Sequence, residues 1–178
     1  MKTVKEQILE HVKLLIGLQL SYARRAADMR NFGFGKIRDI KGGFVAEYAL
    51  HVQCPWRIEG SEGIVTGRLD LYEPAETLEG DEFESWDYEQ GNLQDVLIGE
   101  LLRGYDSKTR TSINTTQKMC VEDVQADDFG GLCISLSDGY RLVLFPAGSR
   151  GEDWRLFSPE SNRAHFVICG GRIEEENE

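Results

Sequence analysis

The stretch FVAEYALHVQCPWRI, residues 44–58, decides the fold class. All of its even positions are apolar, whereas its odd positions carry most of the polar side chains. Alternation with a period of two is typical of a β-strand that buries one face. A straight strand of this length would run about 50 Å at 3.3 Å per residue. A compact domain of this size is only roughly 40 Å across. We therefore expect the strand to bend or break, most readily at Pro55.

The segments around this stretch predict an α+β fold. Residues 3–17 have apolar side chains at helical spacing after a capping box of Thr3 and Glu6. Residues 91–105 predict a second helix that begins after Asn92 and ends at Gly104. Residues 64–72 provide a partner strand, and the last third of the chain contains four or five further strands with local connections. We expect two helices packed on one side of a mainly antiparallel sheet of about seven or eight strands.

The chain is expected to form a single domain over residues 1–178, because its length allows one sizeable core. Its predicted parts are a helix with a β-meander, an acidic loop, a second helix with antiparallel strands, and an acidic tail: residues 1–72, 73–91, 92–173 and 174–178. The two halves have a similar order of elements, which suggests a weak structural repeat.

Composition narrows the class of protein. The net charge of −11 argues against nucleic acid as a partner, because phosphates require clustered Lys and Arg. No apolar run approaches the roughly 20 residues of a membrane span, and the first residues do not resemble a signal peptide. Four scattered cysteines are typical of buried thiols in a reducing compartment. We expect a cytoplasmic protein that does not associate with membranes.

Cys54 and His51 look at first like a nucleophile with its base. On a regular strand they project from opposite faces, because an odd number of positions separates them. Cys54 shares its face with Trp56, an apolar setting that raises rather than lowers the pKa of a thiol. We therefore expect Cys54 to belong to the core. No metal-ligand spacing and no catalytic motif occurs elsewhere, so we expect no cofactor and lean against an enzyme.

Charged side chains are unevenly distributed. Residues 73–89 carry no basic residue and eight acidic ones, which could form a surface for a basic protein: Glu73, Glu76, Glu79, Asp81, Glu82, Glu84, Asp87 and Glu89. The local basic concentration is Arg24, Arg25 and Arg30. These arginines either bind a carboxylate or phosphate ligand, or pair with acids of the same chain, and we favour the second interpretation.

YALHVQCPWRI followed by GIVTGRLDLYEP resembles a strand pair in a group of small bacterial proteins that have no established activity. The later pattern ISLSDGYRLVLFP, WRLF and HFVI is similar to the C-terminal part of the same group. The resemblance covers most of the chain and implies a fold without implying a chemistry. As a small acidic α+β protein, the chain also resembles toxin-neutralising immunity proteins in class, with no diagnostic motif.

Three functions follow as hypotheses. The first is a protein-binding module, for example one of the immunity kind, that offers the acidic surface to a basic partner. The second is an enzyme or small-ligand binder whose site lies on the polar face of the sheet, with His51, Gln53, Arg57 and Asp70 as its polar groups. The third is a structural role as a homo-oligomer, in which strand edges pair between copies.

Overall fold

The computed structural model describes residues 1–174, which form three α-helices, four 3₁₀ helices and fifteen strands. The helices are α1 (Val4–Val12), α2 (Asp81–Ser85) and α3 (Leu93–Leu102), with the 3₁₀ helices η1 (Lys13–Leu15), η2 (Arg68–Tyr72), η3 (Tyr88–Gln90) and η4 (Ser137–Gly139). Thr3 and Glu6 form a capping box at the start of α1, and Asn92 caps α3 as expected.

The strands form two large antiparallel sheets and one separate hairpin. The first sheet has eight strands in the order β15 (Arg172–Ile173), β14 (Phe166–Cys169), β13 (Glu152–Phe157), β5 (Tyr48–Val52), β2 (Met29–Phe34), β1 (Leu20–Ala26), β9 (Thr111–Asn114) and β8 (Arg103–Asp106). The second has five, β10 (Val121–Ala126), β11 (Leu132–Leu136), β12 (Arg141–Leu144), β6 (Trp56–Gly60) and β7 (Gly63–Gly67). The hairpin is β3 (Arg38–Ile40) with β4 (Gly43–Val45).

This arrangement confirms the α+β fold and corrects four details of the prediction. The described residues contain more strands than expected and a third helix, α2, inside the segment predicted as a loop. Strands of the two halves interleave, since β5 lies between β2 and β13 and β6 pairs with β12. The topology does not show a two-half repeat. The left-handed residue that ends α3 is Arg103, not the expected Gly104.

Residues 44–58 break as their length requires. β5 ends at Val52 in one sheet and β6 begins at Trp56 in the other, with Pro55 between them. The amides of Gln53 and Cys54 both donate to the carbonyl of Asp153 at this crossing. The predicted break is confirmed, and it carries the chain from one sheet to the other. A second, unexpected break separates β4 from β5.

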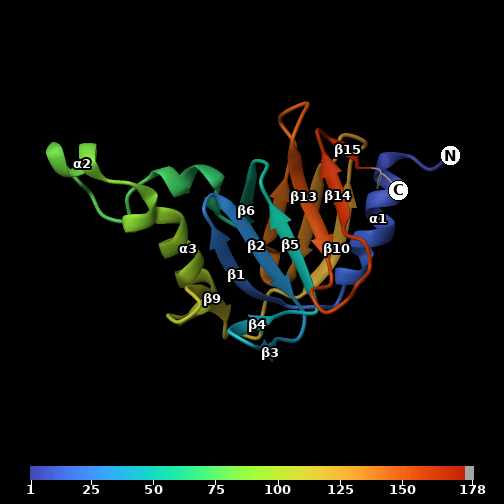
Figure 1. Cartoon of the computed structure of the whole chain (residues 1–178), viewed down its shortest axis with the longest axis horizontal. Helices are drawn as coiled ribbons and strands as arrows, with labels where there is room; N and C mark the ends of the chain where they lie inside the picture. The colour runs from blue at the N-terminus through green and yellow to red at the C-terminus, as the bar shows by residue number, and fades with distance from the viewer. Residues whose placement is uncertain (175–178) are drawn as a thin grey trace.

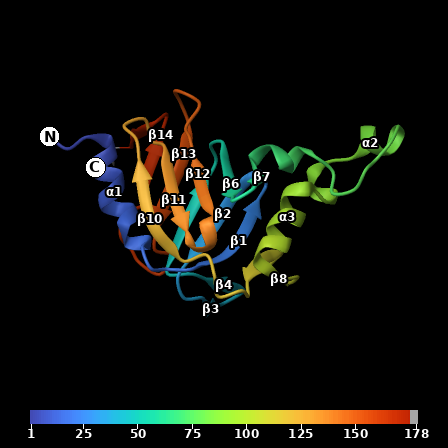
Figure 2. The same ribbon diagram turned by 180° about the vertical axis from the view of Figure 1, so that it is seen from behind.

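The core lies between the two sheets, which are stacked in Figures 1 and 2. Phe32 of the first sheet meets Trp56 of the second edge to face, with ring centroids 5.2 Å apart. Trp154 is fully buried and donates its indole N–H to the carbonyl of Gly130 at 2.8 Å. Buried aromatic pairs of this kind contribute strongly to the stability of a core. Helix α1 packs beside β10, whereas α3 covers the opposite end of the eight-stranded sheet.

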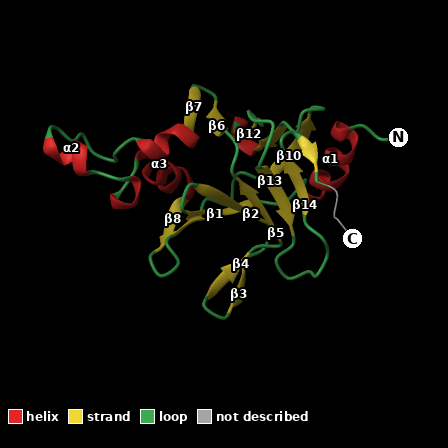
Figure 3. Ribbon diagram, turned by 45° about the horizontal axis from the view of Figure 1, so that its top comes forward, coloured by secondary structure: helices red, strands yellow, loops and turns green. Residues whose placement is uncertain are grey.

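Residues 73–91, here called the acidic arm, extend away from the two sheets. Helix α2 lies at the far end of this arm in Figures 1 and 3. None of the residues of α2 is buried, so the arm has no core of its own. Within residues 1–174, no helix combines the length and the apolar character that a membrane crossing requires.

Candidate functional site

The acidic arm presents its carboxylates to solvent. All eight acidic residues predicted as a partner surface are exposed: Glu73, Glu76, Glu79, Asp81, Glu82, Glu84, Asp87 and Glu89. Large apolar side chains lie exposed among them or next to them, with Phe83 53 % and Tyr72 47 % accessible. The arm therefore combines negative charge with exposed aromatic surface.

Local hydrogen bonds give the arm its shape. Helix α2 begins after Gly80, whose φ of +56° few other residues adopt readily. Its first turn carries three acidic residues, which the positive end of a helix favours. The indole N–H of Trp86 donates to the carbonyl of Gly91 at 2.9 Å and folds the returning chain back on itself.

The two ends of the arm meet at the start of α3. Pro74 and Asn92 form a β-bridge there. Asn92 is buried, and its side chain accepts from the amide of Asp95 and donates to the carbonyl of Tyr88. The same asparagine therefore caps α3 and fixes the returning end of the arm.

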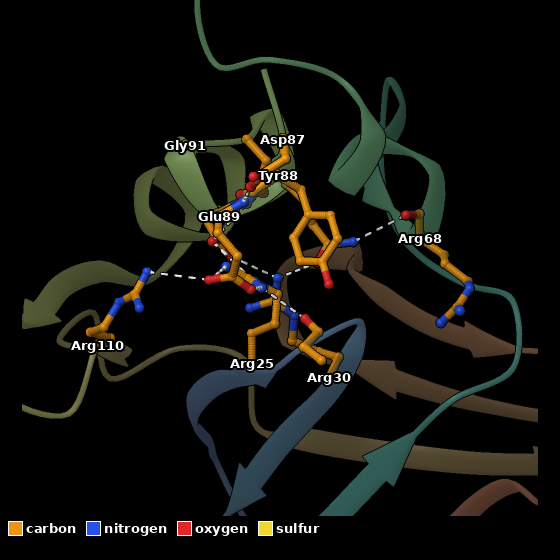
Figure 4. Close-up of polar contacts among 12 residues, drawn as sticks. Arg25, Arg30, Arg68, Asp87, Tyr88, Glu89, Gly91 and Arg110 are labelled. Atoms are coloured by element: carbon orange, nitrogen blue, oxygen red, sulfur yellow. Dashed lines mark hydrogen bonds and ion pairs between the residues drawn. The ribbon is translucent and has the colours of Figure 1, made fainter. Parts of the chain in front are cut away.

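Glu89 joins the arm to the eight-stranded sheet. Its carboxylate accepts a hydrogen bond from Arg25 Nη1 at 2.7 Å and lies 3.7 Å from Arg110 Nη2. The guanidinium of Arg25 also lies over the ring of Tyr88, 5.3 Å from its centroid. Figure 4 shows these side chains converging between β1, η3 and the chain around Arg110. The hydrogen bond from Arg25 is the main cause that lowers the pKa of Glu89.

Asp95 of α3 forms ion pairs with two arginines, Arg25 and Arg30. Its Oδ1 accepts from Arg30 Nη2 at 2.8 Å, and its Oδ2 accepts from Arg25 Nε at 3.2 Å. Arg30 is only 2 % exposed and also donates to the side-chain oxygen of Gln94. Arg25, Arg30, Gln94, Asp95, Glu89 and Arg110 are called the arginine anchor below.

In the arginine anchor, burial and ion pairing shift the pKa values of the charged groups in opposite directions. Burial is the largest influence on Arg30 and lowers its pKa, against the attraction of Asp95. Burial alone would raise the pKa of Asp95, but the charge and hydrogen bond of Arg30, the hydrogen bond of Asn92 and the charge of Arg25 hold it below the ordinary value. Asp95 therefore stays ionised where Arg30 needs a counter-charge.

The three arginines that the sequence placed together separate in the structure. Arg25 and Arg30 pair with acids of the same chain, as we favoured. Arg24 points elsewhere, because adjacent residues of a strand face opposite sides of a sheet. It donates to the Thr111 hydroxyl at 2.8 Å and lies over the ring of Phe44.

His51 and Gln53 lie at the outer side of the eight-stranded sheet. His51 sits beside Arg155 in the register of β5 and β13, with its ring edge to face against Phe157 at 4.8 Å. Burial, reinforced by the charge of Arg155, lowers the pKa of His51 to about 4. Gln53 is exposed beyond the end of β5.

Arg57 and Asp70 belong to different surroundings. Arg57 is in the five-stranded sheet and donates to Glu59 at 2.7 Å. Asp70 accepts from the Thr66 hydroxyl at 2.9 Å and from the amide of Gly67 at 3.1 Å, and so stabilises the start of η2. The structure thus does not gather the four polar residues proposed for a ligand site, because His51 and Arg57 lie on separate sheets with separate partners.

Cys54 is buried beside the crossing between the sheets, and burial raises the pKa of its thiol to about 12. This environment fits a core residue, as expected from the alternation, and not an activated nucleophile. Within residues 1–174, no three His, Cys, Asp or Glu side chains gather as a metal site requires.

Comparison of the chain with protein-family models, with curated proteins and with solved structures gave no match. The resemblance to a group of bacterial proteins therefore stays a prediction.

Sequence reasoning did not anticipate the residues that complete the arginine anchor. Gln94 and Asp95 lie in α3 and Arg110 lies between β8 and β9, far in sequence from Arg25 and Arg30, and Asp95 meets Arg25 across 70 positions of sequence. The one local signal is Asn92, which marks the start of α3 and so places Asp95 in its first turn.

Proposed function

We propose that the protein binds a basic protein partner through its acidic arm. The observation that carries this proposal is the exposure of the arm's carboxylates and the lack of ion-pair partners for most of them within residues 1–174. Within residues 1–174, Glu89 is the only one of the eight that forms an ion pair, and the other seven are exposed on a segment that extends from the sheets. Unpaired carboxylates concentrated on a projecting segment create a negative field that attracts cationic surfaces.

The arm also supports specific contact after the initial encounter. Surface charges increase association rates more than they increase affinity, and aromatic side chains supply much of the affinity of an interface. Phe83 lies between the acidic residues Glu82 and Glu84 and is more than half exposed. We propose Phe83 as the apolar contact and the surrounding acids as the charged rim. The resemblance to immunity proteins makes a basic toxin domain one candidate class of partner.

A comparison of two charge variants tests the proposal. In the arm variant, Glu76, Glu79, Glu82 and Glu84 become Gln. In the matched control, exposed acids away from the arm become amides: Asp39→Asn, Glu62→Gln, Glu100→Gln and Glu122→Gln. Both variants lose the same charge, so the control measures the effect of net charge alone. We expect the wild type and the control to capture the same basic proteins and the arm variant to lose them. Equal capture by all three would overturn the proposal.

A further inference from the structure

A cavity of about 250 Å³ lies beneath the point where the arm joins the sheet. Its walls come from separated parts of the chain: Arg25, Arg30, Glu89, Tyr105, Arg110 and Ser112. Arg25 and Arg30 are paired in the register of β1 and β2, and Ala23, which also lines the cavity, is paired with the core residue Phe32. The cavity therefore continues the inner face of the sheet, with charged side chains where the core ends.

One deeply buried group beside this cavity has unused hydrogen-bonding capacity. Arg30 Nε has no hydrogen-bond partner in the structure, although Arg30 is only 2 % exposed. Ser112 also lines the cavity and is 6 % exposed. Leaving a buried donor unsatisfied is costly, so such groups mark positions where a ligand atom would be stabilised.

The charges around the cavity favour an anion. Arg25, Arg30 and Arg110 are the cationic groups, and Asp95 and Glu89 are the anionic ones. Asp95 is fixed by α3, where it is held by both buried arginines. Glu89 comes from the arm and is 47 % exposed. If Glu89 moved away, the three guanidinium groups would face Asp95 alone and carry an excess of two positive charges.

We propose that this cavity is a binding site for a small oxyanion, a phosphate or carboxylate group, and that Glu89 is the internal group that now occupies its mouth. Guanidinium groups present paired N–H donors that match the oxygens of both anions. The hydroxyl of Ser112, which also lines the cavity, adds a further donor. An oxyanion bound here replaces the Glu89 carboxylate on Arg25 and Arg110.

Binding of the anion would loosen the arm at one of its attachments. The bridge between Pro74 and Asn92 remains, but the ion pairs of Glu89 with Arg25 and Arg110 are exchanged for the ligand. Because the anion and Glu89 compete for the same donors, the affinity for the anion and the mobility of the arm are coupled. This inference concerns the cavity and needs no protein partner, so it stands apart from the proposed function.

Titration of the full chain with inorganic phosphate, followed by NMR at constant ionic strength, tests the site. The key variant is Glu89→Gln, which removes the internal competitor. The matched control is Glu84→Gln, which makes the same change of charge on an exposed, unpaired residue of the arm. Arg110→Gln and Ser112→Ala remove ligand donors, and the side chain of Arg110 is 67 % exposed, so its replacement leaves the fold intact.

We expect saturable chemical-shift changes at Arg25 and Ser112. The Kd for phosphate should be roughly tenfold lower for Glu89→Gln than for the wild type. This factor corresponds to a wild-type site that Glu89 leaves open about a tenth of the time. Glu84→Gln should behave as the wild type, and Arg110→Gln and Ser112→Ala should bind more weakly. The inference is overturned if Glu89→Gln and Glu84→Gln give the same Kd, or if no variant shows a saturable shift near the cavity. Neither result bears on partner binding, because no partner is present.

Discussion

Arg25 Nη1 donates to Glu89 Oε1 at 2.7 Å and so connects strand β1 to the acidic arm across 64 positions of sequence. The Arg25 side chain is 9 % exposed and the Glu89 side chain 47 % exposed, so a nearly buried group of the sheet holds a half-exposed group of the arm. Helix α2 buries none of its residues. The position of the arm therefore depends on polar contacts at its base, and the predictions below follow from those contacts.

Replacement of Asp95 by Asn should destabilise the protein strongly. The variant leaves Arg30 buried without its counter-charge, and removing one partner of a buried pair costs about 3–5 kcal/mol. We expect about 3 kcal/mol, the lower end, because Asp95 itself is partly exposed. Urea unfolding of the wild type and the variant measures the difference. A loss below about 1 kcal/mol, the size of a surface pair, would contradict this role for Asp95.

Replacement of Glu89 by Gln should free the arm without unfolding the sheets. Exposed ion pairs contribute at most about 1 kcal/mol, so the free energy of unfolding should change little. Hydrogen exchange should instead accelerate in residues 76–88, because the contact with Arg25 and Arg110 is lost. Glu84→Gln serves as the control and should leave exchange unchanged. Unchanged exchange in both variants would show that Glu89 does not hold the arm.

His51 should make the protein less stable as the pH falls from 6.5 towards 4. Its pKa is about 4 in the folded protein against an ordinary value of 6.5, so in this range the unfolded chain binds a proton that the folded protein excludes. The contribution is complete above pH 6.5 and is lost as the pH falls through about 4. After a discount for solvent screening it amounts to at most about 2 kcal/mol.

The His51→Gln variant isolates this contribution from the carboxylates that titrate in the same range. The difference in unfolding free energy between wild type and variant should change between pH 6.5 and 4 and should stay constant above pH 6.5. NMR titration of the His51 ring, beside Phe157 and Arg155, gives its pKa directly. A midpoint near 6.5 would contradict the half-buried, neutral state of His51.

Cys54 should be the slowest cysteine to react with a thiol reagent in the native protein. It is buried, and its thiol has a pKa of about 12, so almost no thiolate forms at neutral pH. Cys120, Cys133 and Cys169 are only partly buried and provide internal controls. Mass spectrometry of partially labelled protein gives the order. Early labelling of Cys54 would show that it is accessible or activated.

The sequence predicted the elements whose signals are local. Alternation over residues 44–58 identified the buried face, and the length limit with Pro55 identified the break between β5 and β6. Helices α1 and α3 followed from apolar spacing and from their caps, Thr3 and Asn92. The fold class could be derived from these segments because the helices and the strand each carry their signal within a few consecutive residues.

The features that the sequence could not predict depend on distant contacts. Arg25 and Asp95 are brought together by the pairing of strands and the packing of α3, which no single segment specifies. The alternation placed His51 and Arg57 on one polar face, but the break at Pro55 moved them to separate sheets. Helix α2 was missed because it is short and lacks an apolar face, so periodicity gives no signal for it.

The central claim is that the arm is the surface that binds a basic protein. It is tested most directly by the affinity of one purified captured partner for the wild type, the arm variant and the charge-matched control. Four lost charge contacts at roughly 0.3–0.5 kcal/mol each predict an affinity about tenfold lower for the arm variant. The control should stay within about twofold of the wild type. An equal loss in both variants, or a loss in the control alone, would contradict the assignment of the arm.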